Sequence, residues 1–456
     1  SVGCKVQVLV LFFILVFDVW GSGEGVSSIS IAPMEKNERE ALYLAIQGFA
    51  GNWWNGSDLY PDPCGWTPIQ GVSCDYFYGF WHITSLTIGP MYDNSLNCTQ
   101  NATFNPQLYE LRYLKSLFFF NCFLSPYQNP ITIENSNWEN FANTLESLEF
   151  RSNPGLIGTI PTTLTCLKNL QSLVLLDNGL TGKLPANIGN LIKLRRLVTA
   201  GNRLVGQIPA SIGGMSELLI IDLSRNGLYG SILPSIFGNL TSLLKLDLSK
   251  NMLQGNLPRE IVMLKNLTLL DLSWNKFSSG LTNSVEGMIS LKELILSGNP
   301  VGGDLMSIEW KSFPNLEILE FSNMGLVGNI PNSMTDLRNL KFLGLDNNSL
   351  TGEIPPRLEE LPSLHALRIR GNNFTGKLQF SKGFYEKLGR RFEAWNNPNL
   401  CYSLEMNSSD YVPYGVKPCE NEEEPKEETG ARICNQDSHF VTSRVPSISG
   451  VSLIWK

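Results

Sequence analysis

The sequence predicts an α/β repeat solenoid, a curved right-handed superhelix with a parallel β-sheet on its concave face. Three observations support this prediction: similar segments recur every 24 or 25 residues, leucines alternate within each segment, and an asparagine follows at a fixed place. The regular segments open at Leu145, Leu170, Leu194, Leu218, Leu243, Leu267, Leu291, Leu316, Leu340 and Leu364. Two less regular segments open at Ile83 and Leu114, so residues 81–395 hold about twelve coils.

The first part of each segment has the pattern of a strand with one buried face. Its leucines alternate, as Leu173 and Leu175 do, and therefore point to the same side. One such strand cannot bury its leucines alone, but stacked copies pair in parallel and share a continuous core. A Gly-x-Ile-Pro segment, as in 206–209, then turns the chain into a return leg. We expect this leg to be helical, 3-10 helical or a second strand.

An asparagine marks the turn after each strand. It occurs at Asn153, Asn178, Asn202, Asn226, Asn251, Asn275, Asn299, Asn348 and Asn372. Because its amide both donates and accepts, stacked copies can satisfy buried backbone groups from coil to coil. Cys122 and Met324 replace it in two coils. Methionine cannot make these hydrogen bonds, so we expect a local weak spot near Met324.

The composition argues against several classes of function. The formal net charge is −7 and no long basic run occurs, which disfavours nucleic acid and anionic membrane surfaces as partners. Only three histidines are present, and neither an HExxH motif nor a CxxC pair with zinc spacing occurs. No kinase glycine-rich loop, HRD or DFG motif is found either. We therefore expect no enzyme activity, no cofactor and no metal.

Both ends of the sequence differ from the repeats. The apolar run from Val6 to Trp20 follows Lys5 and predicts a signal peptide over residues 1–23, since it is short for a membrane span. Beyond Cys419 the chain is rich in glutamate, so residues 420–456 are predicted to be an acidic disordered tail. Its last apolar residues could begin a lipid-anchor signal, although an ordinary loose end is the favoured interpretation.

The Gly-x-Ile-Pro form of the repeat resembles plant extracellular leucine-rich-repeat proteins that lack a kinase. The cap predicted over residues 35–80 resembles theirs: an amphipathic helix from Glu38 to Phe49 precedes WWNGSDLYPDPCGW and GVSC. A closing Asn-Pro-x-Leu-Cys motif at 397–401 begins a C-terminal cap over 396–419. Segment 51–80 and the long insertion in the first coil are most similar to the Piriformospora indica-insensitive proteins, a family implicated in responses to a root endophyte at the plasma membrane.

The resemblance implies disulfides, and the sequence carries many glycosylation motifs. The implied pairs are Cys64–Cys74 and Cys401–Cys419, and Cys98 with Cys122 is a further candidate. Cys166 is expected to pack as a small apolar residue, and Cys434 is left over. The Asn-x-Ser/Thr motifs stand at Asn55, Asn97, Asn101, Asn239, Asn266, Asn347, Asn373 and Asn407. Both features predict a secreted glycoprotein from an oxidising compartment.

Outward strand residues give three candidate contact regions on the concave face. Phe118 and Phe120 are candidate apolar contacts, unless the insertion 94–107 covers them. Three aspartates form an acidic stripe, although the repeated Asp-Leu-Ser triplet favours a structural role; they are Asp222, Asp247 and Asp271. Arg368 and Arg370 resemble the RxR motif with which some plant receptors hold the free C-terminus of a peptide, although solvated arginines are the more common case.

The predicted function is therefore binding rather than catalysis. The expected partner is a protein or peptide, such as a receptor kinase ectodomain, in plant signalling or in the response to microbes. The expected location is outside the cell, at the outer face of the plasma membrane or in the cell wall. An alternative is an inhibitor of a secreted microbial cell-wall hydrolase, similar to polygalacturonase inhibitors. The sequence does not name the ligand.

Overall fold

The computed structural model describes residues 33–91, 96–278, 285–403 and 412–420. The chain divides into one unit over residues 1–418 and a second over residues 419–456, of which only Cys419 and Glu420 are described. The predicted signal peptide, the sequon at Asn407 and nearly all of the predicted acidic tail lie outside the described residues.

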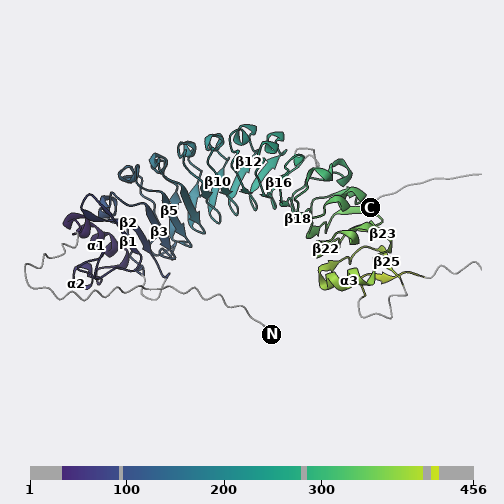
Figure 1. Cartoon of the computed structure of the whole chain (residues 1–456), viewed down its shortest axis with the longest axis horizontal. Coiled ribbons are helices and arrows are strands. Elements are labelled where there is room, and N and C mark those ends of the chain that lie inside the picture. The colour runs from purple at the N-terminus through teal and green to yellow at the C-terminus, as the bar shows by residue number, and fades with distance from the viewer. Residues whose placement is uncertain (1–32, 92–95, 279–284, 404–411, 421–456) are drawn as a thin grey trace, which may run out of the picture. The chain divides into compact units, whose positions relative to one another are not determined.

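One sheet of fourteen strands runs through the first unit in the order of the chain. Its strands are β1 (Val72–Phe77), β2 (Phe80–Ile88), β3 (Ser116–Phe120), β5 (Ser147–Arg151), β7 (Ser172–Leu176), β9 (Arg196–Val198), β11 (Ile220–Asp222), β13 (Lys245–Asp247), β15 (Leu269–Asp271), β17 (Glu293–Ile295), β18 (Ile318–Glu320), β20 (Phe342–Gly344), β22 (Ala366–Arg368) and β24 (Phe392–Glu393). Only β1 is antiparallel to its neighbour; from β2 onward each pair is parallel. The sheet lines the concave side of a curved solenoid, which confirms the predicted fold class (Figure 1).

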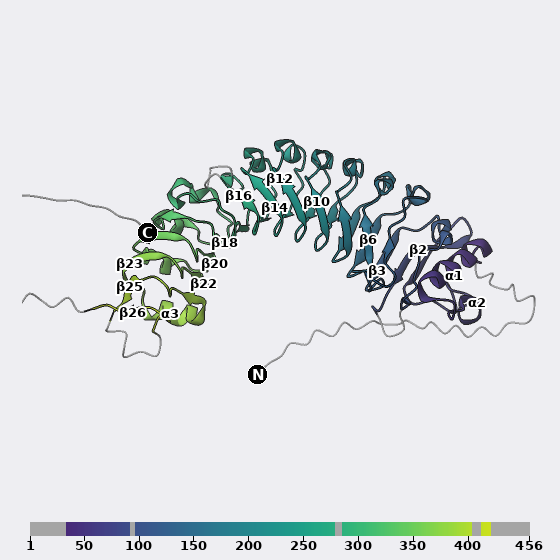
Figure 2. The ribbon, with the colours of Figure 1, turned by 180° about the vertical axis from the view of Figure 1, so that it is seen from behind.

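The return legs contain both second strands and 3-10 helices. Seven second strands form one sheet: β4 (Ile131–Thr132), β6 (Leu156–Thr159), β8 (Gly179–Gly182), β10 (Arg203–Gly206), β12 (Gly227–Gly230), β14 (Met252–Gly255) and β16 (Lys276–Phe277). Five more form another: β19 (Val327–Gly328), β21 (Ser349–Gly352), β23 (Asn373–Leu378), β25 (Asn399–Tyr402) and β26 (Lys417–Pro418). These second strands follow the opposite edge of the coils from the main sheet, as the reverse view shows (Figure 2).

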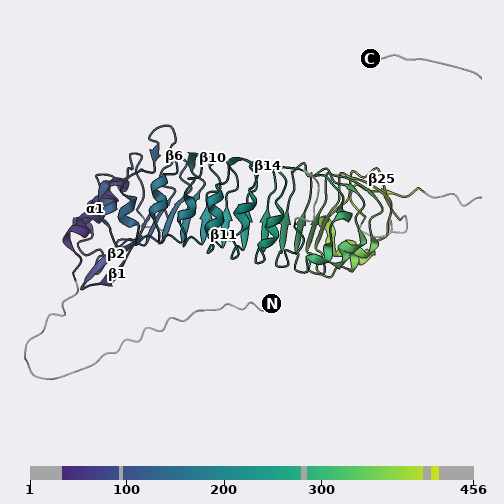
Figure 3. The ribbon, with the colours of Figure 1, turned by 90° about the horizontal axis from the view of Figure 1, so that it is seen from above.

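Short 3-10 helices cover the convex side, where each coil turns back towards its next strand. They are η1 (Pro106–Glu110), η2 (Trp138–Phe141), η3 (Thr162–Cys166), η4 (Ile188–Asn190), η5 (Ala210–Gly214), η6 (Pro234–Phe237), η7 (Arg259–Met263), η9 (Leu305–Ser307), η10 (Trp310–Ser312), η11 (Asn332–Asp336), η12 (Pro356–Glu360) and η13 (Gly389–Arg391). Seen from above, they form a regular row of coils along the solenoid (Figure 3). The repeated leucines of strands and helices are buried between the two sides and form one continuous core.

The predicted asparagine ladder is present in the buried turns. Asn251 Oδ1 accepts a hydrogen bond from the Leu228 amide at 3.0 Å, and its Nδ2 donates to the Leu223 carbonyl at 3.0 Å. The same two bonds recur at Asn202, Asn226, Asn275, Asn299, Asn348 and Asn372. Asn397 adds one further step, which the sequence reasoning did not count as part of the ladder.

The ladder is interrupted at Met324, as the sequence predicts. Its buried thioether replaces the amide, and the Gly302 amide donates instead to the Met324 backbone carbonyl at 2.8 Å. The second strands are interrupted over the same coil, because β16 belongs to one of their sheets and β19 to the other. Met324 thus coincides with a discontinuity in the repeat.

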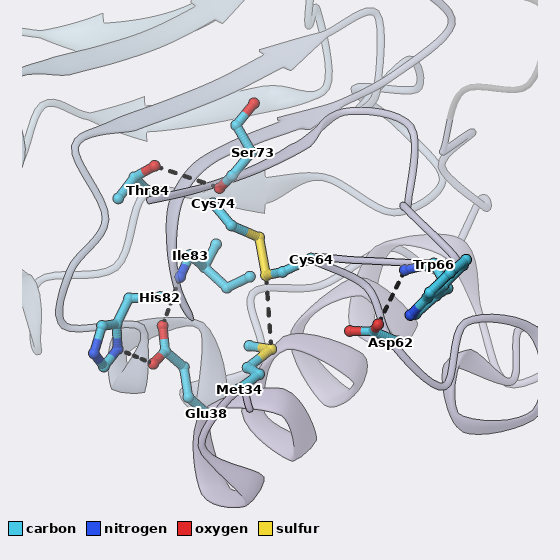
Figure 4. Close-up of a disulfide and its surroundings, with 10 residues drawn as sticks. All are labelled: Met34, Glu38, Asp62, Cys64, Trp66, Ser73, Cys74, His82, Ile83 and Thr84. Atoms are coloured by element: carbon cyan, nitrogen blue, oxygen red, sulfur yellow. Dashed lines mark hydrogen bonds and ion pairs between the residues drawn. A yellow bond between two sulfur atoms is a disulfide. The ribbon is translucent and has the colours of Figure 1, made fainter. Parts of the chain in front are cut away.

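The N-terminal cap is tied to the first coil by covalent and polar contacts. Helix α1 (Lys36–Ala50) packs on the core and precedes the short helix α2 (Gly56–Leu59), and a Cys64–Cys74 disulfide joins the loop after α2 to β1. Glu38 accepts a hydrogen bond from the Ile83 amide at 2.8 Å and contacts His82 Nδ1 at 2.6 Å (Figure 4). Both side chains of this pair are buried, so the cap is held to β2 by a polar contact inside the protein.

The other described cysteines are either disulfide-bonded or free thiols. A Cys98–Cys122 disulfide fixes the insertion to the second coil. Cys401 and Cys419 are both disulfide-bonded, and their predicted pairing with each other remains a prediction. Cys166 is a free thiol at the end of η3 that packs partly against the core. The C-terminal cap adds helix α3 (Lys382–Leu388), which is amphipathic and buries Phe384, Tyr385 and Leu388.

No helix within the described ranges has the length and apolar character needed to cross a membrane. No group of three or more histidine, cysteine, aspartate or glutamate side chains in this part of the chain is placed to hold a metal ion.

Candidate binding face

The outward-pointing residues of the main sheet form a continuous face. Adjacent strands pair in register, so Asp222 lies beside Val198 on one side and Asp247 on the other. The same place in successive coils therefore becomes a column along the concave face, as the sequence spacing predicts. Its members are Thr87, Phe118, Glu149, Val174, Val198, Asp222, Asp247, Asp271, Ile295, Glu320, Gly344 and Arg368.

An open apolar pocket lies at the N-terminal end of this face. Its volume is about 420 Å³, and it is lined by Pro90, Met91, Phe118, Phe120, Glu149 and Arg151. The ring centroids of Phe118 and Phe120 are 6.5 Å apart, and both side chains are partly exposed. The described part of the insertion does not cover them, since its Phe104 packs inward against Phe119. Among the described residues, both phenylalanines thus remain partly exposed at this pocket.

Next to this pocket, an ion-pair cluster crosses three coils. The Glu149 carboxylate lies 2.8 Å from a terminal guanidinium nitrogen of Arg151. It also lies 3.9 Å from a terminal guanidinium nitrogen of Arg196. The Arg151 guanidinium also lies 5.9 Å from the centre of the Phe118 ring. This cluster holds the polar edge of the pocket in a fixed position, which favours a preformed binding surface.

A small apolar cluster on the concave face was missed by the sequence reasoning. Val174, Val198 and Ala200 are buried against one another, apart from the main core, and Leu176 and Ile220 pack beside them. Its signal was present in the sequence, because apolar residues fill outward positions of two consecutive coils. The N-terminal half of the concave face therefore combines apolar residues with one ion-pair cluster, whereas its centre is acidic.

The acidic stripe in the centre serves the fold first. Asp222, Asp247 and Asp271 each accept hydrogen bonds from the backbone amide and hydroxyl of the serine two residues later. The Lys245 Nζ atom lies 3.6 Å from a carboxylate oxygen of Asp222 and 3.6 Å from one of Asp247, so its charge offsets theirs. Burial raises the pKa of the Asp271 carboxyl. The hydrogen bonds that it accepts from Ser273 lower this pKa by a smaller amount. The geometry favours the structural role of the repeated triplet, while the carboxylates still border the face.

At the C-terminal end of the face, Arg368 and Arg370 form ion pairs with carboxylates of the same chain. Glu393 bridges the pair, since its carboxylate oxygens lie 3.4 Å from Arg368 Nε and 3.3 Å from Arg370 Nε. Asp346 lies 3.5 Å from a terminal nitrogen of Arg370. Two guanidinium groups therefore face two carboxylates, and a peptide carboxylate would have to compete with them. Sequence reasoning missed Glu393 because the coil that carries it lacks the regular opening leucines.

Seven of the predicted glycosylation sites lie within the described residues. All seven described sequon asparagines are exposed: Asn55, Asn97, Asn101, Asn239, Asn266, Asn347 and Asn373. Exposure is what glycan attachment requires, and occupancy remains a prediction. Asn347 lies in the turn that follows β20, next to the arginine pair, so a glycan there would limit access to that end. None of the sequons falls on the concave strands from β3 to β18.

Comparison with known proteins agrees with this architecture. The family model described as "Leucine-rich repeat region" matches residues 159–403, more than half of the chain. The chain therefore belongs to the leucine-rich repeat family. It is 60% identical to Piriformospora indica-insensitive protein 2 of Arabidopsis thaliana over 148 residues, which confirms the resemblance seen in the sequence. That match covers 32% of this chain and 34% of the relative.

Other similarities are to receptor-like proteins and receptor ectodomains. Receptor like protein 29 of Arabidopsis thaliana is 35% identical over 180 residues, covering 37% of this chain and 35% of that protein. The matched segments thus span about a third of each of these two relatives. The solved complex of PEPR1 with AtPEP1 has a TM-score of 0.60 at 26% identity and covers 80% of this chain and 52% of that one. The Arabidopsis HAESA ectodomain with an IDA peptide hormone has a TM-score of 0.56 at 30% identity. That match covers 65% of this chain and 48% of the HAESA chain.

Proposed function

We propose that this protein is a non-catalytic extracellular binding protein that holds a peptide or protein on its concave face. The observation that carries the proposal is the pocket formed by Phe118 and Phe120 on a wide, rigid sheet. Exposed aromatic side chains on a preformed surface supply binding energy at low entropic cost. The solved HAESA ectodomain is in complex with an IDA peptide hormone, which supports a ligand of this kind.

The proposed setting is plant signalling or the response to microbes. The similarity to Piriformospora indica-insensitive protein 2 supports this setting through that relative's name alone. The proposed location is the cell exterior, either at the outer face of the plasma membrane or in the cell wall. Disulfides and exposed sequons support it, because both are typical of the secretory route.

Binding experiments with the full glycosylated chain would test the proposal. The chain is immobilised and challenged with a panel of receptor kinase ectodomains, candidate extracellular peptides and secreted fungal cell-wall hydrolases. Paired substitution Phe118→Ser with Phe120→Ser is expected to weaken capture of the partner at least tenfold, since each phenylalanine contributes about 1–2 kcal/mol of contact. The matched control is Tyr229→Ser with Met252→Ser, on exposed residues of β12 and β14.

The panel also separates the two candidate functions. Capture of an ectodomain or peptide that depends on the phenylalanine pair supports a signalling role. Capture of a hydrolase alone, with loss of that enzyme's activity, would instead establish an inhibitor. The mixed charge of the concave face, with an acidic centre, disfavours the inhibitor, which would be expected to use a basic cluster.

A further inference from the structure

A second pocket lies at the C-terminal end of the solenoid, away from the N-terminal pocket. Its volume is about 540 Å³, within the usual range for small-ligand sites. Its walls come from α3, η13, the end of the main sheet at β24 and the segment that precedes β26; Figure 1 labels α3 at this end of the solenoid. The lining residues are Tyr385, Gly389, Arg390, Phe392, Trp395, Val412, Pro413 and Tyr414.

Four aromatic side chains dominate these walls. Tyr385 and Phe392 meet edge to face with ring centroids 5.4 Å apart, and Trp395 and Tyr414 do so at 5.7 Å. Flat rings on several sides are suited to receiving another flat apolar group by stacking or edge contact. Tyr414 is 79% exposed, which is unusual for an aromatic residue that contacts a tryptophan, so this wall is open to a ligand.

One charged side chain of the pocket has no partner within the described residues. Arg390 is exposed, lines the same pocket and has no ion pair or hydrogen bond in the described ranges. The neighbouring Arg391, by contrast, donates to the carbonyls of Leu388 and Lys387.

We propose that this pocket binds a small aromatic carboxylic acid. Its ring would lie between the aromatic walls, and its carboxylate would pair with the Arg390 guanidinium. Arginine and carboxylate groups form strong charge-assisted hydrogen bonds, which selects an acid over its neutral amide. A cationic ligand, which aromatic walls alone would also suit, is disfavoured by the positive charge of Arg390.

Calorimetric titration of the full chain with 2-naphthoate and with its neutral analogue 2-naphthamide tests this site. The acid is expected to bind at least tenfold more tightly than the amide, as one charge-assisted bond implies. The Arg390→Gln substitution should abolish this preference while leaving the melting temperature unchanged.

A charge-matched control is available one residue away. Arg391→Gln removes the same charge from a side chain that is occupied by backbone carbonyls, and it should leave the preference for the acid intact. Equal binding of acid and amide, absence of binding by either, or a preference that depends on Arg391 rather than Arg390 would each overturn the proposal. None of these outcomes would bear on the phenylalanine pocket, which is a separate site.

Discussion

Arg370 and Glu393 form an ion pair across neighbouring coils, with 3.3 Å between Nε and a carboxylate oxygen. The other oxygen of the same carboxylate lies 3.4 Å from Arg368 Nε, so a single side chain bridges the arginine pair. Arg368 also lies over the Phe342 ring, and Arg370 over the Trp395 ring. The positive charge expected of this end of the face is thus largely matched within the chain.

Removing the bridging carboxylate should create the anion site that the sequence suggested. We expect a pool of random hexapeptides with free C-termini to bind the Glu393→Gln variant about fivefold to tenfold more tightly than it binds the wild type. The reason is that the two guanidinium groups lose the carboxylate that bridges them. Fluorescence anisotropy would measure this gain. The same pool with amidated C-termini should gain nothing. A gain for both pools, or for neither, would show that the pair is not an available carboxylate site.

Neutralising Asp271 should stabilise the protein at neutral pH. Burial holds the pKa of this carboxyl above its unfolded value of about 3.9, so the folded state binds the proton more tightly. The free energy of unfolding of the wild type therefore falls as the pH rises from the unfolded-state pKa to the folded-state pKa of Asp271. It stays lower at higher pH. Asp271→Asn keeps an acceptor for Ser273 and should add about 1 kcal/mol at pH 7, with no gain below about pH 4.

Urea unfolding at a series of pH values would measure this effect. Asp247→Asn serves as a control, because Asp247 lies beside Lys245 and its neutralisation removes an ion pair. The control is expected to be neutral or slightly destabilising at pH 7. A gain at Asp271 that persists unchanged at pH 3 would contradict the account of its burial.

The contact between Glu38 and His82 should hold the N-terminal cap in place. Glu38→Ala leaves the Ile83 amide and the His82 ring nitrogen without their buried partner, and we expect a loss of about 3 kcal/mol in the free energy of unfolding. Glu38→Gln keeps an acceptor and should cost less. The control Glu40→Ala removes only an exposed pair with Lys36 and should cost under about 0.5 kcal/mol. Equal losses at both positions, measured by urea unfolding, would refute this role.

The interruption of the ladder at Met324 should appear as faster amide exchange. The Leu253 and Leu350 amides each donate to the asparagine of the following coil, whereas Met324 offers the equivalent Val301 amide no side-chain acceptor. Hydrogen exchange measured by mass spectrometry should show the peptide around Val301 exchanging at least tenfold faster than those around Leu253 and Leu350. Uniform protection across the three peptides would mean that packing alone sustains this coil.

Strict periodicity explains how much of the fold could be predicted. The spacing of leucine and asparagine fixes strand positions, burial and register, so the column from Thr87 to Arg368 follows directly from the sequence. Side-chain partners across coils do not follow from that spacing. Glu393 belongs to a coil without the regular leucines, and the cluster of Val174, Val198 and Ala200 depends on contacts between neighbouring outward positions. The C-terminal pocket is made by irregular cap segments, which carry no period at all.

Hydroxyl-radical footprinting of the complex would show whether the concave face binds the partner. The full chain is labelled alone and with the first partner captured from the panel, and oxidation is compared residue by residue. We predict protection of Phe118 and Phe120 in β3, with unchanged oxidation of Tyr229 and Met252 on the second sheet. Protection of Tyr229 and Met252, with the two phenylalanines still fully reactive, would contradict the account.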